Sequence, residues 1–194
     1  MYKWVERLAR LMAVAGGVVL TLLVGLTCLS VLGRGLNTLG HSDLLGSLSE
    51  RVAGGLISSG VGPINGDFEL VEAGVAFAIF SFLPICQLYK AHATVDIFTN
   101  ALPRGANRIL TAFWELVLSA VILLITWRLF VGTQNKLSYG ETTFILQFPI
   151  WWAYGLSFIA ACVASIVSIY CAAMRLIEMF AGRDHLLGSE ESGQ

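Results

Sequence analysis

The chain has 194 residues, of which 56% are hydrophobic and only 13% are charged, and its net charge at pH 7 is −1. Soluble globular domains carry roughly 25% charged residues. A chain of this length has too much surface for its excess of apolar residues to be buried in a core. The composition therefore excludes an ordinary soluble protein and favours lipid as the solvent. The small net charge argues against a nucleic-acid partner, and the four cysteines form no CxxC pair, which argues against a disulfide framework or a thiol redox site.

Four apolar runs follow one another along the chain, each close to the roughly 20 residues that a helix needs to cross a bilayer. They cover residues 11–32, 70–88, 109–131 and 150–174. The first run follows basic residues as a secretion signal would, but it is too long for the apolar part of a signal peptide and no small-residue cleavage site follows it. The sequence therefore predicts an all-α integral membrane protein with four transmembrane helices, the first of them uncleaved, in a single domain over residues 1–180.

The distribution of Lys and Arg between the loops predicts the orientation in the membrane, because cytoplasmic loops carry an excess of both. Eight of the twelve lie in the N-terminal segment, the second loop and the tail, and four lie on the opposite side. Both termini are therefore expected in the cytoplasm. The long loop over residues 33–69 is then periplasmic, and the polar tail over residues 181–194 is expected to be disordered.

Small residues recur every four positions in two of the predicted helices. Lipid gives little hydrophobic drive for helix association, so small residues that let two backbones approach closely mark contact faces. Both stripes are therefore interpreted as packing seams, either within the chain or against a larger partner. The stripes are Ala160, Ala164, Ser168 and Ala172 in the fourth helix and Ala13, Gly17, Thr21 and Gly25 in the first.

The stretch LYKAHATVDIF, Leu88 to Phe98, follows the second apolar run and contains His92 and Asp96 one helical turn apart. With the apolar spacing from Val95 to Leu102, it predicts an amphipathic helix along the cytoplasmic membrane surface, between the second and third membrane helices. A catalytic pair is disfavoured because no nucleophile or third orienting group is evident nearby. A metal site is disfavoured because two side chains are too few ligands. A structural or subunit-contact role for His92 and Asp96 is favoured.

Three stretches together resemble the small Q subunit (DctQ type) of TRAP (tripartite ATP-independent periplasmic) transporters. The first is the H-x-x-V-D pattern from His92 to Asp96, followed by Leu102-Pro103. The others are FELVEAGVAFAIF, which contains Glu72 and is similar to that family's second helix, and TFILQFPIWWAYG, which contains Pro149 and is similar to the entrance of its fourth helix. The resemblance implies a multi-pass protein of the bacterial inner membrane that is not an enzyme.

The same resemblance implies a scaffold role in a sodium-driven importer of an organic acid or related solute. Its partners would be the large M subunit, which carries the substrate and ion sites and moves as an elevator, and a periplasmic solute-binding protein. No cofactor or metal ion is expected. The positions expected to help dock the binding protein are Ser42, Glu50, Lys136 and Glu141.

Two carboxylates lie within the predicted spans, where they are costly and are read as functional candidates. Glu72 is expected either to reach the outer interface or to contact a neighbouring subunit. Glu115 lies deeper, and is expected to pair with a cation, either Arg108 or one from a partner, or to be held protonated. The residues alone leave two other classes open, a small transporter that acts by itself as an oligomer and a four-helix membrane enzyme. The spans lack the paired charges and inverted repeat typical of the first, and the external loops lack the cysteines of a thiol oxidoreductase.

Overall fold

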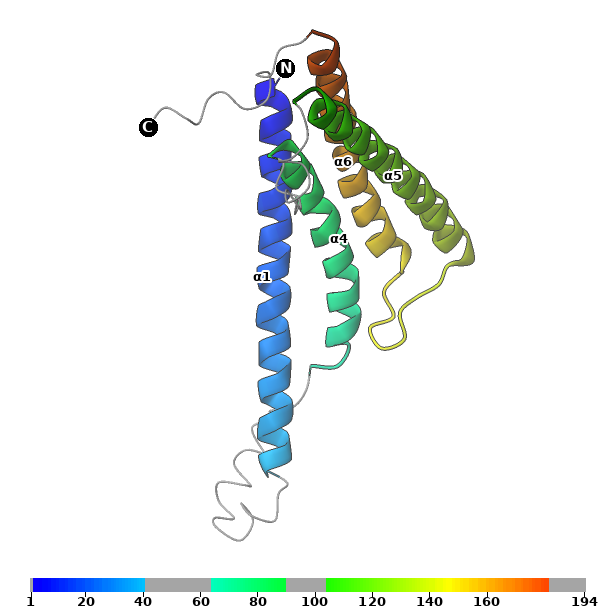
Figure 1. The fold of residues 1–194 in the computed structure, drawn as a ribbon. Coiled ribbons are helices and arrows are strands. Elements are labelled where there is room, and N and C mark those ends of the chain that lie inside the picture. The colour runs from blue at the N-terminus through cyan, green and yellow to red at the C-terminus, as the bar shows by residue number, and fades with distance from the viewer. Residues whose placement is uncertain (1, 41–63, 90–103, 182–194) are drawn as a thin grey trace.

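The structure is a computed structural model that describes residues 2–40, 64–89 and 104–181, apart from the side chains at 104, 106–108 and 178–181. Within these ranges it contains four helices (Figure 1), and each includes a stretch long and apolar enough to cross a membrane. The predicted all-helical fold with four spanning helices is confirmed at this level. The helices are α1 (Tyr2–Gly40), α4 (Asp67–Leu88), α5 (Arg104–Tyr139) and α6 (Trp151–Ala181).

The helices continue beyond the apolar runs that predicted them. α1 has 39 residues, about 58 Å at the usual rise, and so exceeds the roughly 30 Å of a bilayer's hydrocarbon core. Residues 33–40, expected in the periplasmic loop, are helical instead. Hydropathy marks only the part of a helix that favours lipid, whereas the backbone hydrogen bonds of α1 continue because no proline interrupts them.

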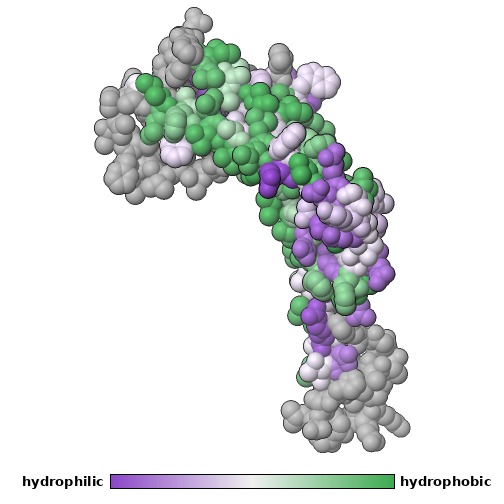
Figure 2. All heavy atoms as spheres, turned by 90° about the vertical axis from the view of Figure 1, so that its right-hand side faces the viewer, coloured by the Kyte–Doolittle hydropathy of each residue, from purple (hydrophilic) through white to green (hydrophobic). Residues whose placement is uncertain are grey.

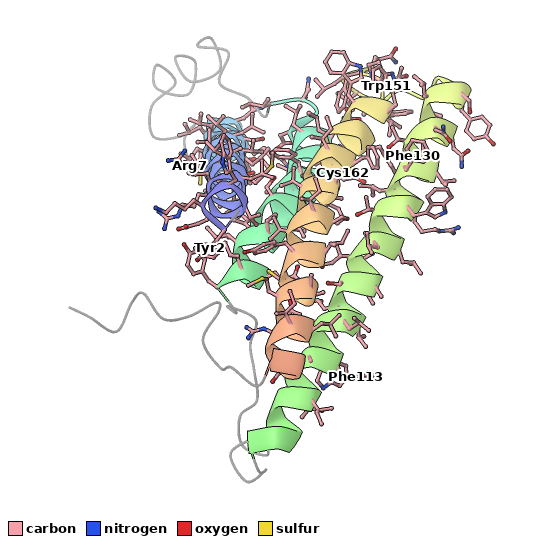
Figure 3. All side chains as sticks on the ribbon, turned by 90° about the horizontal axis from the view of Figure 1, so that it is seen from above. Tyr2, Arg7, Phe113, Phe130, Trp151 and Cys162 are labelled. Carbon is pink, nitrogen blue, oxygen red and sulfur yellow. The ribbon has the colours of Figure 1, made fainter. Side chains whose placement is uncertain are left out.

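The four helices form an open row. α1 packs on α4, α4 packs on α6, and α6 packs on α5, with a smaller contact between α1 and α6. The view from above shows the same order, with α6 between α4 and α5 (Figure 3). α6 therefore has a neighbour on two sides, whereas α5 packs mainly on α6 and leaves the rest of its surface exposed.

Helices that follow one another along the chain run in opposite directions (Figure 1). We call the end where α1 and α5 finish and α4 and α6 begin the loop end, and the opposite end the terminal end. α4 and α6 therefore run in the same direction, and the hydrogen bond from Gln87 to Ser168 places residues 81 positions apart at similar depths. At the terminal end the core is a small cluster of Ala9, Leu88, Val167 and Cys171.

Large apolar side chains cover much of the outer surface, as expected where lipid replaces water. On α1, for example, Leu11, Leu22 and Leu29 are more than half exposed. Figure 2 shows the α5 side of the molecule: the surface toward the terminal end is mainly hydrophobic, and hydrophilic residues gather toward the loop end. This distribution agrees with a protein whose long axis crosses a bilayer.

Candidate functional site: helix seams and a groove at the loop end

The contact between α1 and α4 follows a spacing of seven residues on α1. Ala9, Gly16 and Ser30 are buried on this face. A Cβ added to Gly16 would lie 2.8 Å from the Cβ of Ser81 on α4, so only glycine allows the two backbones to approach this closely. The seam of α1 is therefore set by heptad-like positions.

The predicted small-residue stripe of α1 does not coincide with this seam. Gly17 and Gly25 have no atom of another residue near the place where a Cβ would stand, and Thr21 is exposed. A step of four residues turns about 400°, so an i, i+4 stripe drifts about 40° per step around the helix. By Gly25 it has turned away from α4, and within the described residues it remains uncovered.

The corresponding stripe of α6 is buried inside the chain. Ala160, Ala164 and Ser168 have relative exposures of 0%, 1% and 0%. The same drift that moves the α1 stripe away from its main neighbour α4 moves the α6 stripe from α4 toward α5, because α6 lies between α4 and α5. The structure thus places these three residues in intramolecular seams, and whether a second subunit also depends on them stays a prediction.

A polar cluster joins α4, α5 and α6 within the membrane-spanning region. The amide nitrogen Nε2 of Gln87 donates to Glu115 Oε1 at 2.9 Å and to Ser168 Oγ at 3.0 Å. The hydroxyls of Ser119 and Ser168 lie 2.6 Å apart, and Ser119 also donates to the Ser168 carbonyl oxygen at 3.0 Å. We call Gln87, Glu115, Ser119 and Ser168 the three-helix cluster; the buried Gln87 Oε1 has no partner among the described residues.

The three-helix cluster differs from the expectation for Glu115, because its observed donor is a neutral amide and not a cation. The side chain of Arg108 lies outside the described side chains, so that pairing stays a prediction. Sequence reasoning missed Gln87 and Ser119. The available signal was a Gln near the end of an apolar run, since an amide placed in lipid without a partner is costly.

A second polar contact lies nearer the loop end of the α5–α6 seam. The hydroxyls of Thr126 and Ser165 are 2.8 Å apart, and Thr126 also approaches the Ala161 carbonyl oxygen at 3.2 Å. Further along, the rings of Phe130 and Phe158 lie 5.4 Å apart. Hydrogen bonds of this kind between small side chains are a usual means of holding helices together in lipid.

Ion pairs and hydrogen bonds fasten both ends of the α1–α4 contact. At the loop end, Arg34 Nη2 lies 2.5 Å from Asp67 Oδ2. At the terminal end, Tyr89 donates to Glu6 Oε1 at 2.9 Å and accepts from Arg10 at 3.0 Å. These contacts lie where the apolar runs stop, and they fix how α1 and α4 are aligned along the membrane normal.

The loop between α5 and α6 is a compact turn that rests on the start of α4. Its backbone pairs Thr142 with Pro149 in an isolated antiparallel bridge, and the Pro149 carbonyl accepts from Trp152 N at 3.2 Å at the start of α6. The predicted docking residues Lys136 and Glu141 pair with each other at 2.5 Å. Pro149 thus has a structural position at the entrance of α6.

Glu69 attaches this loop to α4. The side chain is buried, and its two carboxylate oxygens accept from the backbone N–H groups of Ile145 at 2.7 Å and Leu146 at 3.0 Å. The Leu146 side chain also lies against Gly66, whose φ is +83° and where a Cβ would be 2.5 Å from Leu146 Cγ. Glu69 is a third residue that sequence reasoning missed, because it lies in the first turn of a helix whose apolar run starts one residue later.

A groove of about 470 Å³ opens toward the loop end between α4, the α5–α6 loop and the start of α6, with Leu129 as its lining residue from α5. Glu72 lines it with an exposed side chain, and Ser157 is a lining residue whose buried hydroxyl has no hydrogen-bond partner among the described residues. We call this space the loop-end groove. Its lining is Phe68, Glu69, Glu72, Ala73, Ala76, Phe80, Leu129, Thr142, Thr143, Phe144, Phe148, Ile150, Ala153, Tyr154 and Ser157.

Four of the predicted contact residues lie outside the described ranges. His92 and Asp96, with the predicted amphipathic helix, fall between α4 and α5, and Ser42 and Glu50 fall between α1 and α4. Their roles stay predictions. Within the described part of the chain, no three His, Cys, Asp or Glu side chains gather in a way that would hold a metal ion.

Residues 59–179 match the protein family described as tripartite ATP-independent periplasmic transporters, DctQ component. The chain belongs to this family. The predicted family is thereby confirmed, and α4, α5 and nearly all of α6 lie in the matched segment. No curated protein and no solved structure matches the chain. As a DctQ component it is the small membrane subunit of a TRAP transporter, a multi-pass protein of the bacterial inner membrane and a transport component, not an enzyme.

Proposed function

We propose that this DctQ subunit is a scaffold that packs beside the large M subunit and holds it in the bilayer, in a sodium-coupled importer of an organic acid or related solute. The observation that supports this role is the distribution of polar groups. In the described part of the spans, the three-helix cluster and the Thr126–Ser165 pair direct polar side chains toward one another inside the chain. A solute pathway needs polar groups that face a cavity along the full depth of the membrane, whereas the loop-end groove extends along α4 only from Phe68 to Phe80. Solute and ion chemistry then belong to the M subunit and the binding protein.

α1 supplies the face that we assign to the M subunit. It has only one strong neighbour in the chain, and its small-residue stripe is uncovered at Gly17, Thr21 and Gly25. The Thr21 hydroxyl bonds the Gly17 carbonyl within the same helix at 2.8 Å, so the stripe needs no polar partner. Such a surface admits another helix at short interaxial distance.

The proposed orientation places both termini in the cytoplasm and the loop end in the periplasm. The α5–α6 loop then faces the solute-binding protein, and Phe144 at its tip is 91% exposed. The Lys136–Glu141 pair lies at the base of the same loop, and Ser42 and Glu50 belong to the other periplasmic segment. These residues form the proposed docking side, while His92 and Asp96 would contact the M subunit from the cytoplasmic side.

Copurification in mild detergent tests the scaffold role. A tagged chain is expected to recover a polytopic partner at a fixed stoichiometry. Gly17→Leu together with Gly25→Leu is expected to lower that recovery by about tenfold or more, since side chains would separate the two backbones. The amount of the chain itself should not change, because both positions are open within it. His92→Ala and Asp96→Ala should weaken the association while solute binding by the soluble partner is unchanged.

Gly16→Leu is the matched control, one residue away on the same helix. There the added side chain meets Ser81 inside the chain, so the chain itself should become less stable and less abundant. Equal partner recovery from the wild-type chain and the Gly17/Gly25 double variant would show that α1 does not carry the contact. Solute uptake by this chain alone in proteoliposomes would overturn the scaffold role altogether.

A further inference from the structure

The shape of the loop-end groove suits a thin, elongated occupant. Its lining runs along α4 from Phe68 to Phe80, a distance of about 18 Å along the helix axis. A hydrocarbon chain is much thinner than a helix with its side chains, which is about 10–12 Å across, and it fits lengthwise along this lining.

The charge of the groove favours a cation. Its described lining contains two carboxylates and no Lys or Arg. Glu69 already accepts two backbone N–H groups, and the nearby Lys136 is paired with Glu141. Glu72 makes no hydrogen bond or ion pair with any described residue, so its carboxylate is the available acceptor. A carboxylate at this depth is costly unless a donor reaches it.

Ser157 provides a second, independent sign of an occupant. The residue is 2% exposed and its hydroxyl has no partner among the described residues, although it lines the groove. Buried hydroxyls are normally hydrogen-bonded. α4 and α6 run in parallel with Gln87 beside Ser168, so Ser157 lies level with Ala76, about one turn (roughly 6 Å) deeper than Glu72.

We propose that the loop-end groove binds one phospholipid with a primary ammonium headgroup. The ammonium donates to Glu72, the Ser157 hydroxyl donates to an ester or phosphate oxygen, and one acyl chain lies over Ala76 toward Phe80. α4 has 22 residues, about 33 Å, close to the thickness of the hydrocarbon core, so Glu72 lies near one interface and Phe80 nearer the midplane. With the orientation proposed above, the lipid belongs to the outer leaflet.

Native mass spectrometry of the full chain, released from mild detergent alone or with the partner that copurifies with it, tests this site. The probes are dioleoyl phosphatidylethanolamine and dioleoyl phosphatidylglycerol, which share acyl chains and differ in headgroup charge. We expect at least about tenfold higher occupancy by phosphatidylethanolamine, in the range of one charge-assisted hydrogen bond. Glu72→Gln should remove that preference, whereas Glu115→Gln, an intramembrane carboxylate outside the groove, should retain it.

Two further variants keep the proposal testable if Glu72→Gln folds poorly. Glu72→Lys should reverse the preference toward phosphatidylglycerol, and Ala76→Phe should lower occupancy by both lipids because it fills the groove. Equal binding of both lipids to the wild-type chain, or unchanged binding to the Glu72 variants, would overturn the proposal. So would a photocrosslinker at Ala153 that captures a peptide of the large subunit in place of lipid. Lipid binding is read on this chain whether or not the partner copurifies, so its failure is distinct from a failure to recover the M subunit.

Discussion

Gln87 is the residue at which three helices meet. Its single amide nitrogen donates both to Glu115 on α5 and to Ser168 on α6, so one side chain of α4 satisfies acceptors on its neighbour α6 and on the next helix in the row. In lipid there is no water to replace a missing donor, and the cost of an unpaired group is correspondingly high. Glu115 thereby accepts a hydrogen bond that helps to hold α5 to the rest of the fold.

This geometry predicts that Gln87 matters more for stability than the charge of Glu115. Gln87→Leu removes the donor from two acceptors and is expected to destabilise the fold by about 1 kcal/mol, which lowers the melting temperature by about 2–4 °C for a chain of this size. Glu115→Gln keeps a carbonyl oxygen for the Gln87 amide and should melt close to the wild type. Tryptophan fluorescence during heating in detergent measures both. If Glu115→Gln were the more damaging change, the carboxylate charge itself would be required.

At the scale of elements, the α5–α6 loop depends on α4 as much as on its own turn. Its internal bridge between Thr142 and Pro149 consists of two backbone bonds, from Thr143 N to the Phe148 carbonyl at 2.9 Å and from Ile150 N to the Glu141 carbonyl at 3.0 Å. The attachment to the rest of the protein is the Glu69 carboxylate. Hydrogen bonds to a buried charged acceptor contribute about 1.5–3 kcal/mol each, so this attachment is expected to dominate the order of the loop.

Glu69→Ala should therefore increase amide hydrogen exchange at Ile145 and Leu146 by at least about tenfold, since each amide loses a charged acceptor. Glu69→Gln retains one carbonyl oxygen and should have an intermediate effect. The control is Glu141→Ala, which breaks the ion pair between this loop residue and Lys136 at the end of α5 but leaves both amides bonded. Exchange measured by mass spectrometry distinguishes the three variants. Equal protection of the two amides in all of them would show that the turn is ordered without α4.

At the scale of the whole molecule, the helices form an open row and leave wide apolar faces on either side of it. A chain built this way covers few of its own surfaces, which suits a subunit that completes its packing against lipid and a larger neighbour. Which end of the molecule faces the periplasm depends on the orientation of the chain in the membrane. The uneven distribution of Lys and Arg between the loops predicts that both termini are cytoplasmic.

Site-directed labelling tests that orientation. In a cysteine-free background, Tyr139→Cys at the loop end should react with a membrane-impermeant maleimide added to spheroplasts, because the native side chain is 74% exposed there. Lys3→Cys at the terminal end is also at an exposed position and should react only after the membrane is permeabilised. The reverse pattern would place both termini in the periplasm and move the loop-end groove to the inner leaflet.

The sequence by itself determined that lipid surrounds the chain, how many helices span the membrane and to which family the chain belongs. These follow from properties of single residues and local runs: the low charge, the four apolar stretches, and motifs such as the one around His92. It also marked the α6 stripe of Ala160, Ala164 and Ser168 as a packing surface, but it could not say which helix would lie against it.

Only the tertiary structure decided which faces meet. In water, an apolar stripe identifies the buried side of a helix, but in lipid both the packed and the exposed sides are apolar. The stripe at Gly17 and the seam at Gly16 therefore look alike in the sequence, although one is open and the other touches Ser81. The partners of Gln87 and Glu69 are likewise separated from them by tens of residues, so their pairing depends on how the helices are placed in the row and not on any local pattern.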